Sequence, residues 1–497
     1  MRAFFIFQIL LIFTLAHLEK ETVSEVIALA GWPPEVLAYA MAMYSRSSLS
    51  IKESIRKITN EKAQGFLDTF YFKYGHKSIA DNAHIPLAIE NVSEIVAFEL
   101  EDQQLWDGQE RSTRYQNFDK PDAYYIPEVI RRTPLEREYC LIADFSLDQY
   151  RDYEKLCFEY LVKKHPKPEN MKDADYERTL KARAFDVSRY WLFNGIITSI
   201  GQITSARTLE DQICRMMASE YLEVVKIAQD MKAACQAKPF CPEGKDESPI
   251  APTLVKYTTS NGYLVRVRKL MEEMIDEGEV LQERYVKLAY PFRTIKQEIL
   301  AGLIYEASQG AYDSIHGAVS MYGSEKIDRI IKKVLSLRDK HDALPRAFDA
   351  GYQIQFDVCM DIGGRRDLHR HRNCIQLNQR FTTDKGFDIP KLVEEIGKTD
   401  HFKDNMETVA KRIKILKKSA VGNNADYLIP FAFRAGTLYK MSYRQAEYIS
   451  VLRSTPQGHF SYRQVVVEMD RQLRDLVPGL EEHSRVTPFE YEDPFKR

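Results

Sequence analysis

The sequence predicts a helix-rich α+β protein built from two tandem copies of one domain. Three observations lead to this prediction. Much of the chain carries apolar residues at helical spacing, a few runs such as "GYQIQFDV" have the character of strands, and one order of elements occurs twice. With 497 residues, of which 44% are hydrophobic, the chain can fill more than one core.

In the first copy, a periodic segment starts after Ser50, which is a candidate helix cap, and ends near His76. Ile51 and Ile55 recur on one side of it, as in a helix that covers a core. We therefore expect one helix over residues 51–74, followed by the largely apolar stretch "HIPLAIENVSEIVAFELEDQQLW".

The second copy repeats this order. Ile327, Ile330, Ile331 and Val334 share one side of the segment "KIDRIIKKVLSLRDKHDALP", which ends near His341. Another apolar stretch, "GYQIQFDVCMDIGGRRDLHRHR", follows. The shared order predicts a duplication.

A linker is predicted between the copies. The segment "QAKPFCPEGKDESPIAPTL" contains four prolines and lacks periodicity, so the boundary falls near residue 245. The predicted organisation is an apolar extension (1–26), a first domain (27–240), a linker (241–262) and a second domain (263–497).

Charge and cysteine content limit the classes of function. The 70 basic and 72 acidic residues nearly cancel, so any anion site must be local, and broad binding of nucleic acid is not expected. Seven cysteines, an odd number at irregular positions, favour reduced thiols over a disulfide framework. We expect a cytoplasmic protein with no membrane partner.

The amino terminus allows a second interpretation. The run "MRAFFIFQILLIFTLAH" is long enough for the core of a signal peptide, short for a spanning helix, and lacks an A-x-A cleavage site. It is either a secretory or anchoring segment, or an appended one.

We expect deletion of residues 1–20 to leave a folded, active protein, because the run precedes the first globular pattern. Thermal melting and activity of the truncated chain would check this. Loss of folding, or sedimentation of the intact protein with membranes, would contradict the cytoplasmic assignment.

The strongest local charge lies in "LHRHRNCIQLNQRF". His369 precedes the cluster Arg370, His371 and Arg372, and Arg380 follows it. Arginine matches phosphate oxygens with two parallel hydrogen bonds, so this cluster is a candidate clamp for phosphate or a nucleotide.

Other interpretations of the cluster stay open. Asp361 and Asp367 could neutralise neighbouring arginines on an ion-paired face. A nucleic-acid surface would need interleaved aromatic residues, which are missing here. His369 and His371 alternate like two metal ligands, but no third ligand is recognisable, so no metal site is predicted.

Arg370-His371-Arg372 followed by "NCIQLNQRF" resembles the signature of flavin-dependent thymidylate synthases, the ThyX family. In that family, Arg-His-Arg, seven residues and a serine lead into an Arg-Tyr pair. The segments "LFNGIITSIGQITSARTLE" and "YLIPFAFRAGTLYKMSYRQAEYISVLRSTPQGHFSYRQ" resemble later parts of the family. They place Arg207 and Arg463 among its arginine positions, with weaker support.

The first copy is more similar over "YGHKSIADNAHIPLAIENVSEIVAFELEDQQLWDGQERSTRYQNF". It has Gly75-His76-x-Ser78 and then Ser112-x-Arg114-Tyr115 at the family's interval. It departs from the family at residues 102–104, where Asp-Gln-Gln replaces Arg-His-Arg. In the second copy the spacing from Arg-His-Arg to "QRF" is two residues short. Neither copy keeps the whole signature.

The resemblance implies binding of FAD and of the substrate dUMP. It implies synthesis of dTMP with methylene-tetrahydrofolate, the electrons coming from NADPH or NADH. It also implies a homodimer that acts as a pseudo-tetramer, because the family's sites lie between subunits. A non-catalytic or repurposed member that binds a nucleotide or flavin is the alternative.

Roles are carried over only where this sequence matches the family. The implied assignment is Arg453 as the catalytic residue facing the uracil, Ser112, Arg114, Arg372 and Arg453 as dUMP ligands, and His76, Ser78, Arg370, His371 and Arg372 as FAD ligands. Cys374, beside the cluster, is interpreted as a packed spectator.

Overall fold

The computed structural model describes most of the 497-residue chain. The described residues are 27, 29, 31–43, 50–73, 77–113, 116, 118, 123–242, 248–262, 265, 283–288, 295–307, 312–336, 347–348, 353–477, 484–491 and 495. The apolar run at the amino terminus, His76 and Arg114 therefore lie outside the described residues.

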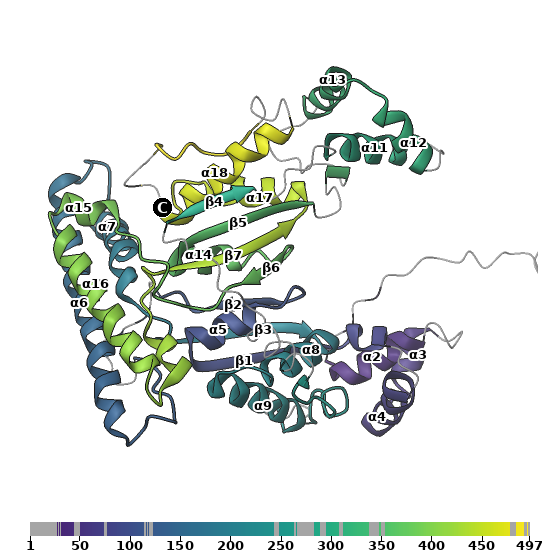
Figure 1. Ribbon diagram of the computed structural model, residues 1–497. Coiled ribbons are helices and arrows are strands. Elements are labelled where there is room, and N and C mark those ends of the chain that lie inside the picture. Colours follow the sequence, from purple (N-terminus) through teal and green to yellow (C-terminus); the bar gives the residue numbers. More distant parts are fainter. Residues whose placement is uncertain are drawn as a thin grey trace, which may run out of the picture.

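The first half combines one small sheet with helices on both sides (Figure 1). Its elements are α2 (Pro34–Ala42), α3 (Ile51–Ile55), α4 (Asn60–Leu67), η2 (Asp68–Lys73), η3 (Lys77–Asn82), β1 (His84–Ser93), α5 (Glu94–Glu101), β2 (Asp107–Glu110), α6 (Pro134–Lys164), α7 (Asp173–Ser188), η5 (Arg189–Trp191), β3 (Ile197–Ser205), α8 (Ala206–Met216) and α9 (Leu222–Gln236).

The second half repeats this plan. Its elements are β4 (Tyr285–Leu288), α11 (Ile295–Ala307), α12 (Tyr312–Ser320), α13 (Ser324–Leu335), β5 (Ile354–Asp361), α14 (Ile362–His369), β6 (Ile375–Asn378), α15 (Lys391–Glu395), α16 (Thr399–Lys417), η7 (Gly422–Leu428), β7 (Arg434–Met441), α17 (Tyr443–Arg453) and α18 (Phe460–Leu476).

The two sheets have the same strand order. β3 lies between β1 and β2, and β7 lies between β5 and β6, with β4 added beside β5; every pair is antiparallel. α5 follows β1 as α14 follows β5, and α8 and α9 follow β3 as α17 and α18 follow β7. These findings confirm the α+β class and the duplication.

The prediction of one continuous helix over residues 51–74 is wrong, because the structure has two shorter helices, α3 and α4, in this segment. Ser50 caps α3 in a capping box with Glu53, as predicted, but α3 ends at Ile55. The hydroxyl of Thr59 then accepts the Lys62 amide and caps α4, so a second helix starts one turn later. In the second half, the apolar side predicted for residues 327–334 packs into the core as expected.

The halves meet through reciprocal backbone hydrogen bonds. The Asn194 amide donates to the Ile429 carbonyl (3.2 Å), and the Phe431 amide donates to the Leu192 carbonyl (2.7 Å). Each bond has a counterpart with the two halves exchanged, so an approximate two-fold axis passes between these segments. Asn194 therefore corresponds to Phe431, and Leu192 to Ile429.

The same symmetry aligns α5 with α14. Glu94 is the first residue of α5, and its amide donates to the carbonyl of Ile196, which directly precedes β3. Ile362 is the first residue of α14, and its amide donates to the carbonyl of Phe433, which directly precedes β7. Counting onward from this pair, residues 102–104 occupy the positions of residues 370–372. The spatial alignment therefore agrees with the sequence alignment, in which Asp-Gln-Gln of the first copy replaces Arg-His-Arg.

Each half has a buried pair of one hydroxyl and one carboxylate, and the two groups stand at interchanged positions in the two halves. In the first half, Ser93 donates its hydroxyl to the carboxylate of Glu223 (2.6 Å). At the corresponding positions of the second half, the hydroxyl of Ser461 donates to the carboxylate of Asp361. Each half keeps one hydroxyl and one carboxylate at this place, which satisfies both buried groups.

The hydrophobic core does not follow the division into two halves. Val393, Phe402 and Met406, from α15 and α16, belong to the same buried cluster as the first-half core. α16 lies beside α6 and α7 in Figure 1. A second cluster fills the space among β5, α11, α13, α17 and α18. Residues 251–255, in the predicted linker, also pack into the first-half core.

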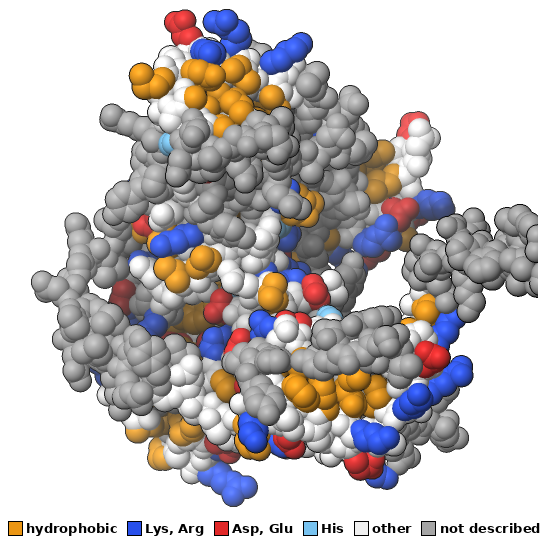
Figure 2. All heavy atoms as spheres, turned by 90° about the vertical axis from the view of Figure 1, so that its right-hand side faces the viewer, with side chains coloured by type: hydrophobic (Ala, Val, Ile, Leu, Met, Phe, Trp, Pro, Cys, Tyr) orange, Lys and Arg blue, Asp and Glu red, His pale blue; other side chains and the backbone are white. Residues whose placement is uncertain are grey.

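The surface and the thiols agree with the composition. Figure 2 shows basic and acidic side chains mixed with apolar ones on the face in view. All seven cysteines are free. Within the part of the chain that the structure describes, no helix has the length and apolar character needed to cross a bilayer.

Candidate functional site

α14 carries the basic cluster to the boundary between the halves. The Gly364 amide donates to the carboxylate of Asp361 (2.7 Å), which caps the helix. A Cβ atom on Gly364 would lie 2.6 Å from the Ser461 hydroxyl oxygen, so glycine permits the close approach of α14 to α18. Arg366 and Arg370 are one turn apart, so both face the first half.

A polar cavity of about 210 Å³ lies at this boundary. Both halves contribute to its wall. The lining residues are Ser112, Thr113, Phe185 and Arg189 from the first half, and Gly363, Arg366, Asp367, Arg370, Arg453 and Tyr462 from the second. Four guanidinium groups from three places in the sequence, η5, α14 and α17, therefore converge on one space.

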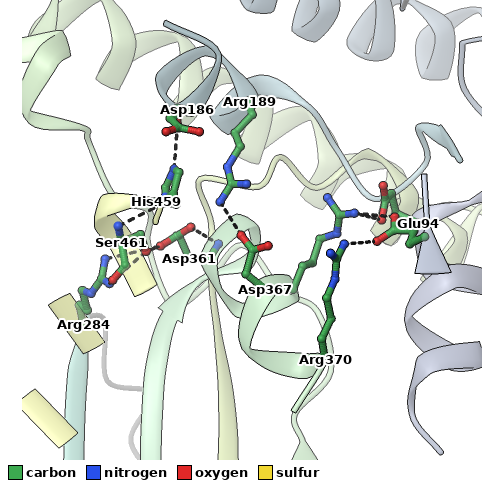
Figure 3. A network of polar contacts seen from close by, with 12 residues as sticks. Glu94, Asp186, Arg189, Arg284, Asp361, Asp367, Arg370, His459 and Ser461 are labelled. Carbon is green, nitrogen blue, oxygen red and sulfur yellow. Dashed lines mark hydrogen bonds and ion pairs between the residues drawn. The ribbon is translucent and has the colours of Figure 1, made fainter. Parts of the chain in front are cut away.

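Two buried glutamates of the first half hold the arginines of α14. Arg366 contacts Glu94 (2.6 Å) and Glu110 (2.7 Å), and Arg370 contacts Glu110 (2.8 Å). Figure 3 shows Arg370 extending toward the group of side chains that includes Glu94. The ion-paired interpretation is thus right in kind. Of the two partners that it named, Asp361 is wrong, because it caps α14 and contacts Arg284, whereas the charge of Asp367 does act on Arg370.

The two glutamates differ in acidity. Burial raises the pKa of Glu94 well above its usual range, more than Arg366 lowers it. Burial also acts on Glu110, but Arg366 and Arg370 together outweigh it and lower the pKa of that carboxyl. Glu110 is therefore the more acidic of the two carboxyl groups, and Glu94 takes up a proton more readily.

On the other side of the cavity, Arg189 contacts Asp367 at 3.2 Å (Figure 3). Burial opposes ionisation, yet Arg189, Arg370 and Arg453 hold the pKa of Asp367 well below its usual range. Asp367 stays ionised. The four arginines outnumber the three carboxylates that contact them, Asp367, Glu94 and Glu110, so basic groups are in excess around the cavity.

Arg453 reaches the cavity from the end of α17. Its Nε donates to Nε2 of His371 (2.7 Å), and its guanidinium lies 5.5 Å from the centre of the Tyr462 ring. Burial, and then the charges of Arg453 and Arg372, lower the pKa of His371 to about 3. The neutral ring can therefore accept the hydrogen bond that orients Arg453.

We expect His371 to remain neutral between pH 5 and pH 8. An unfolded histidine titrates near 6.5. Its contribution to stability is therefore complete above that pH, and acid lowers it as pH falls toward the folded pKa of about 3. Ring-proton NMR shifts, assigned with a His371→Gln variant, would test this. A titration midpoint inside the window would contradict it.

Of the other predicted site residues, some line the cavity and some do not. Ser112, from the first copy, lines the cavity together with Arg370 and Arg453, from the second. Arg372 lies outside the lining, with its guanidinium 4.5 Å from the Trp106 ring and 3.7 Å from Asp107. Ser78 is exposed on η3, away from the lining residues. His76 and Arg114 lie outside the described residues.

Three further residues from the sequence analysis, Arg207, Arg463 and Cys374, make structural contacts. Arg207 forms a half-exposed ion pair with Asp81 (2.6 Å). Arg463 is buried and donates to backbone carbonyls, including that of Ser454 (3.0 Å). Cys374 is buried, and burial raises the pKa of its thiol to about 12, so it is the packed spectator that the sequence predicted.

Sequence reasoning missed several residues of the cavity. Arg366 could have been found, because it lies one helical turn before Arg370 and so shares its face. Arg189 and Tyr462 carry no local signal. Arg189 follows the long helix α7, and only the joint between the halves brings it to Asp367.

The cavity fits a phosphate group better than a whole flavin. The buried Nε atoms of Arg189 and Arg370, both in the lining, have no hydrogen-bond partner within the protein, so they are available to an anion. The volume is smaller than the roughly 300–1,000 Å³ of typical sites for drug-sized ligands. FAD, if bound, would extend beyond the cavity. Among the described residues, no cluster of His, Cys, Asp or Glu is suited to a metal ion.

A comparison with protein families gives one match. The sequence model of the family described as "Thymidylate synthase complementing protein" matches residues 25–243 and 297–479. The two matched stretches coincide with the two structural halves.

Comparison with curated proteins gives relatives that match nearly end to end. A UPF0159 protein of Chlamydia muridarum is 24% identical over 492 residues, which cover 94% of this chain and 92% of the relative. UPF0159 protein Ta1429 of Thermoplasma acidophilum is 25% identical over 476 residues, covering 88% and 93%. A UPF0159 protein of Chlamydia pneumoniae is 23% identical over 494 residues, covering 94% and 92%.

Proposed function

The chain belongs to the thymidylate synthase complementing protein family, and on this premise we propose that it is an FAD-dependent thymidylate synthase. The proposed reaction converts dUMP to dTMP with methylene-tetrahydrofolate and a reduced nicotinamide nucleotide. The observation that carries the proposal is the cavity at the boundary, where Arg189, Arg366, Arg370 and Arg453 converge with a surplus of positive charge. A phosphate monoester dianion complements that charge.

The proposed roles follow from position. Ser112, Arg189 and Arg453 would bind the dUMP phosphate and orient the nucleotide, since all three line the cavity. Neutral His371 would keep Arg453 in place through its 2.7 Å hydrogen bond. Fixed donors of this kind cost no reorganisation during the reaction.

FAD would be held by Arg370, His371 and Arg372. The bound flavin would supply hydride chemistry, which no side chain can provide. Arg372 lies on the Trp106 ring, so its guanidinium plane is fixed beside the cavity rather than inside it. This arrangement supports separate places for the flavin phosphates and for the nucleotide.

Two chains would associate to complete the flavin site, because the cavity in one chain is too small for FAD. Light scattering should then give twice the mass of one chain, which is 57.8 kDa. A strictly monomeric protein that nevertheless retains FAD would refute this part of the proposal.

The proposal is tested by genetic rescue and by flavin content. The gene should restore growth to a strain that requires thymidine, and the purified protein should show flavin absorbance. An Arg370→Ala/Arg372→Ala double variant should lose flavin, since charge-assisted hydrogen bonds contribute about 1.5–3 kcal/mol each, or roughly tenfold or more in affinity.

The matched control is Arg207→Ala, which removes an arginine from a half-exposed ion pair outside the cavity. It should rescue growth and keep its flavin. Thermal melting of each variant separates loss of ligand from loss of fold. Unchanged flavin in a folded double variant would reject the assignment.

A second candidate function is a non-catalytic protein that binds a nucleotide or flavin. The ion pair of Arg370 with buried Glu110 favours it, because part of the cluster is already neutralised within the protein. Binding of dUMP or FAD without turnover, and without rescue, would support this candidate over the synthase.

A further inference from the structure

The approximate two-fold symmetry provides two equivalent positions at the boundary, and only one of them has the basic cavity. We propose that each chain binds a single phosphate monoester, in the cavity beside α14, and that the equivalent position beside α5 has become a closed structural joint. Only the identity of the ligand rests on the proposed function.

The symmetry identifies what replaces each cavity arginine. α8 and α17 are both eleven residues long and both follow a capping serine, so Met216 stands where Arg453 stands. Aligning Glu94 with Ile362 places Phe98 at the position of Arg366 and Asp102 at that of Arg370.

The fourth arginine is replaced as well. The reciprocal bonds between the halves include Gly195 to the Tyr427 carbonyl (2.6 Å) and Ala432 to the Tyr190 carbonyl (3.1 Å). Tyr190 therefore corresponds to Tyr427, and the preceding Arg189 corresponds to Asp426. None of the four guanidinium groups has a basic counterpart beside α5.

Side chains fill the position beside α5. The His369 ring stacks on Phe98 with centroids 3.9 Å apart, and Phe381 meets Phe98 edge to face at 5.7 Å. The guanidinium of Arg365, which is 1% exposed, lies 4.6 Å from the Phe98 ring and 5.4 Å from the Phe381 ring. Phe98, the common member of these contacts, holds the position that corresponds to Arg366 of the cavity.

The charges beside α5 also oppose an anion. Arg215 contacts Glu99 (2.6 Å), and Lys417 contacts Asp426 (2.6 Å), so these basic groups are already paired. Asp102 lies 3.9 Å from Arg215 and accepts a hydrogen bond from Asn378 (3.4 Å). At the positions of Arg370 and Arg189, a phosphate here would therefore meet the carboxylates of Asp102 and Asp426 in place of guanidinium groups.

The number of sites per chain tests this inference. Equilibrium dialysis in phosphate-free buffer would use two separate probes, labelled dUMP and labelled inorganic phosphate. We expect saturation at one equivalent per chain. Arg453→Ala should weaken binding at least tenfold, since it removes a guanidinium from the cavity.

The matched controls change the equivalent position. Arg215→Ala and Arg380→Ala remove basic side chains on the α5 side, and Arg380 is half-exposed, so its replacement should not affect folding. Neither variant should change the stoichiometry or the affinity. Thermal melting would identify any control that fails to fold.

Each outcome separates the two proposals. Two equivalents per chain, or weaker binding in a folded Arg380→Ala variant, would overturn the single-site inference. Absence of binding of both probes to folded protein would overturn it too. One equivalent of phosphate with no binding of dUMP would reject the proposed function and leave the single-site inference in place.

Discussion

Replacing Arg453 with alanine is expected to abolish thymidylate formation while the chain stays folded. The side chain is half-buried at the end of α17, where it donates to His371 and lies against the Tyr462 ring. No buried carboxylate depends on it as an ion-pair partner within 4 Å among the described residues. Loss of one preorganised donor typically costs about 10²–10³ in rate.

The measurement is dTMP production at saturating dUMP, with dUMP affinity determined separately. Arg453→Lys keeps the charge but lacks the second arm of the fork, so it should recover only part of the activity. Arg207→Ala is the control at an ion pair outside the cavity and should be fully active. A folded Arg453→Ala protein with more than about a tenth of the normal rate would contradict the assigned role, since that loss is below the range for one donor.

Separating the halves is expected to remove all activity. Residues 1–262 and 263–497, produced alone, would each lack part of the cavity wall, since Ser112 and Arg189 come from one fragment and Arg370 and Arg453 from the other. The fragments would also be unstable, because Phe402 and its neighbours on α16 are buried in the core of the other half.

Mixing the two fragments during refolding should restore activity, and size-exclusion chromatography should show a complex with the mass of the intact chain. Intact protein refolded in parallel is the control. Arg114→Ala in the full chain provides an independent arm, since Ser112-x-Arg114 survives only in the first copy. Turnover by residues 263–497 alone, or full activity of Arg114→Ala, would show that the second copy works by itself.

Local features of the fold were predictable from the sequence. The cap at Ser50, the apolar side of α13 and the strand over Ile354–Asp361 depend on residues a few positions apart, which a pattern records. The break before Thr59 was missed, because the apolar spacing continues across it while the hydroxyl of Thr59 starts a new helix.

The candidate site was predictable only in part. The sequence pointed to Arg370 and Arg453 through the family resemblance, and both line the cavity. It could not supply Glu110 as the partner of Arg370, because 260 positions separate them and the contact depends on how two sheets meet. Arg189 was hidden for the same reason.

The buried glutamates also determine which halves can associate. Aligning β2 with β6 places Asn378 at the position of Glu110, because these residues pair with equivalent positions on β3 and β7. A pair of two second halves would face Arg366 with Ile362 and Asn378, leaving buried guanidinium groups without anions. A pair of two first halves would bury Glu94 and Glu110 without cations.

Both mismatches leave uncompensated buried charge, which is strongly destabilising. Newly made chains that meet before they have finished folding would therefore gain little from exchanging like halves. Only a first half paired with a second half compensates all of these buried charges. The covalent connection holds such a pair in the same chain at high effective concentration. The charges at the boundary thus favour the pairing of unlike halves, and the covalent connection favours the pairing of two halves of the same chain.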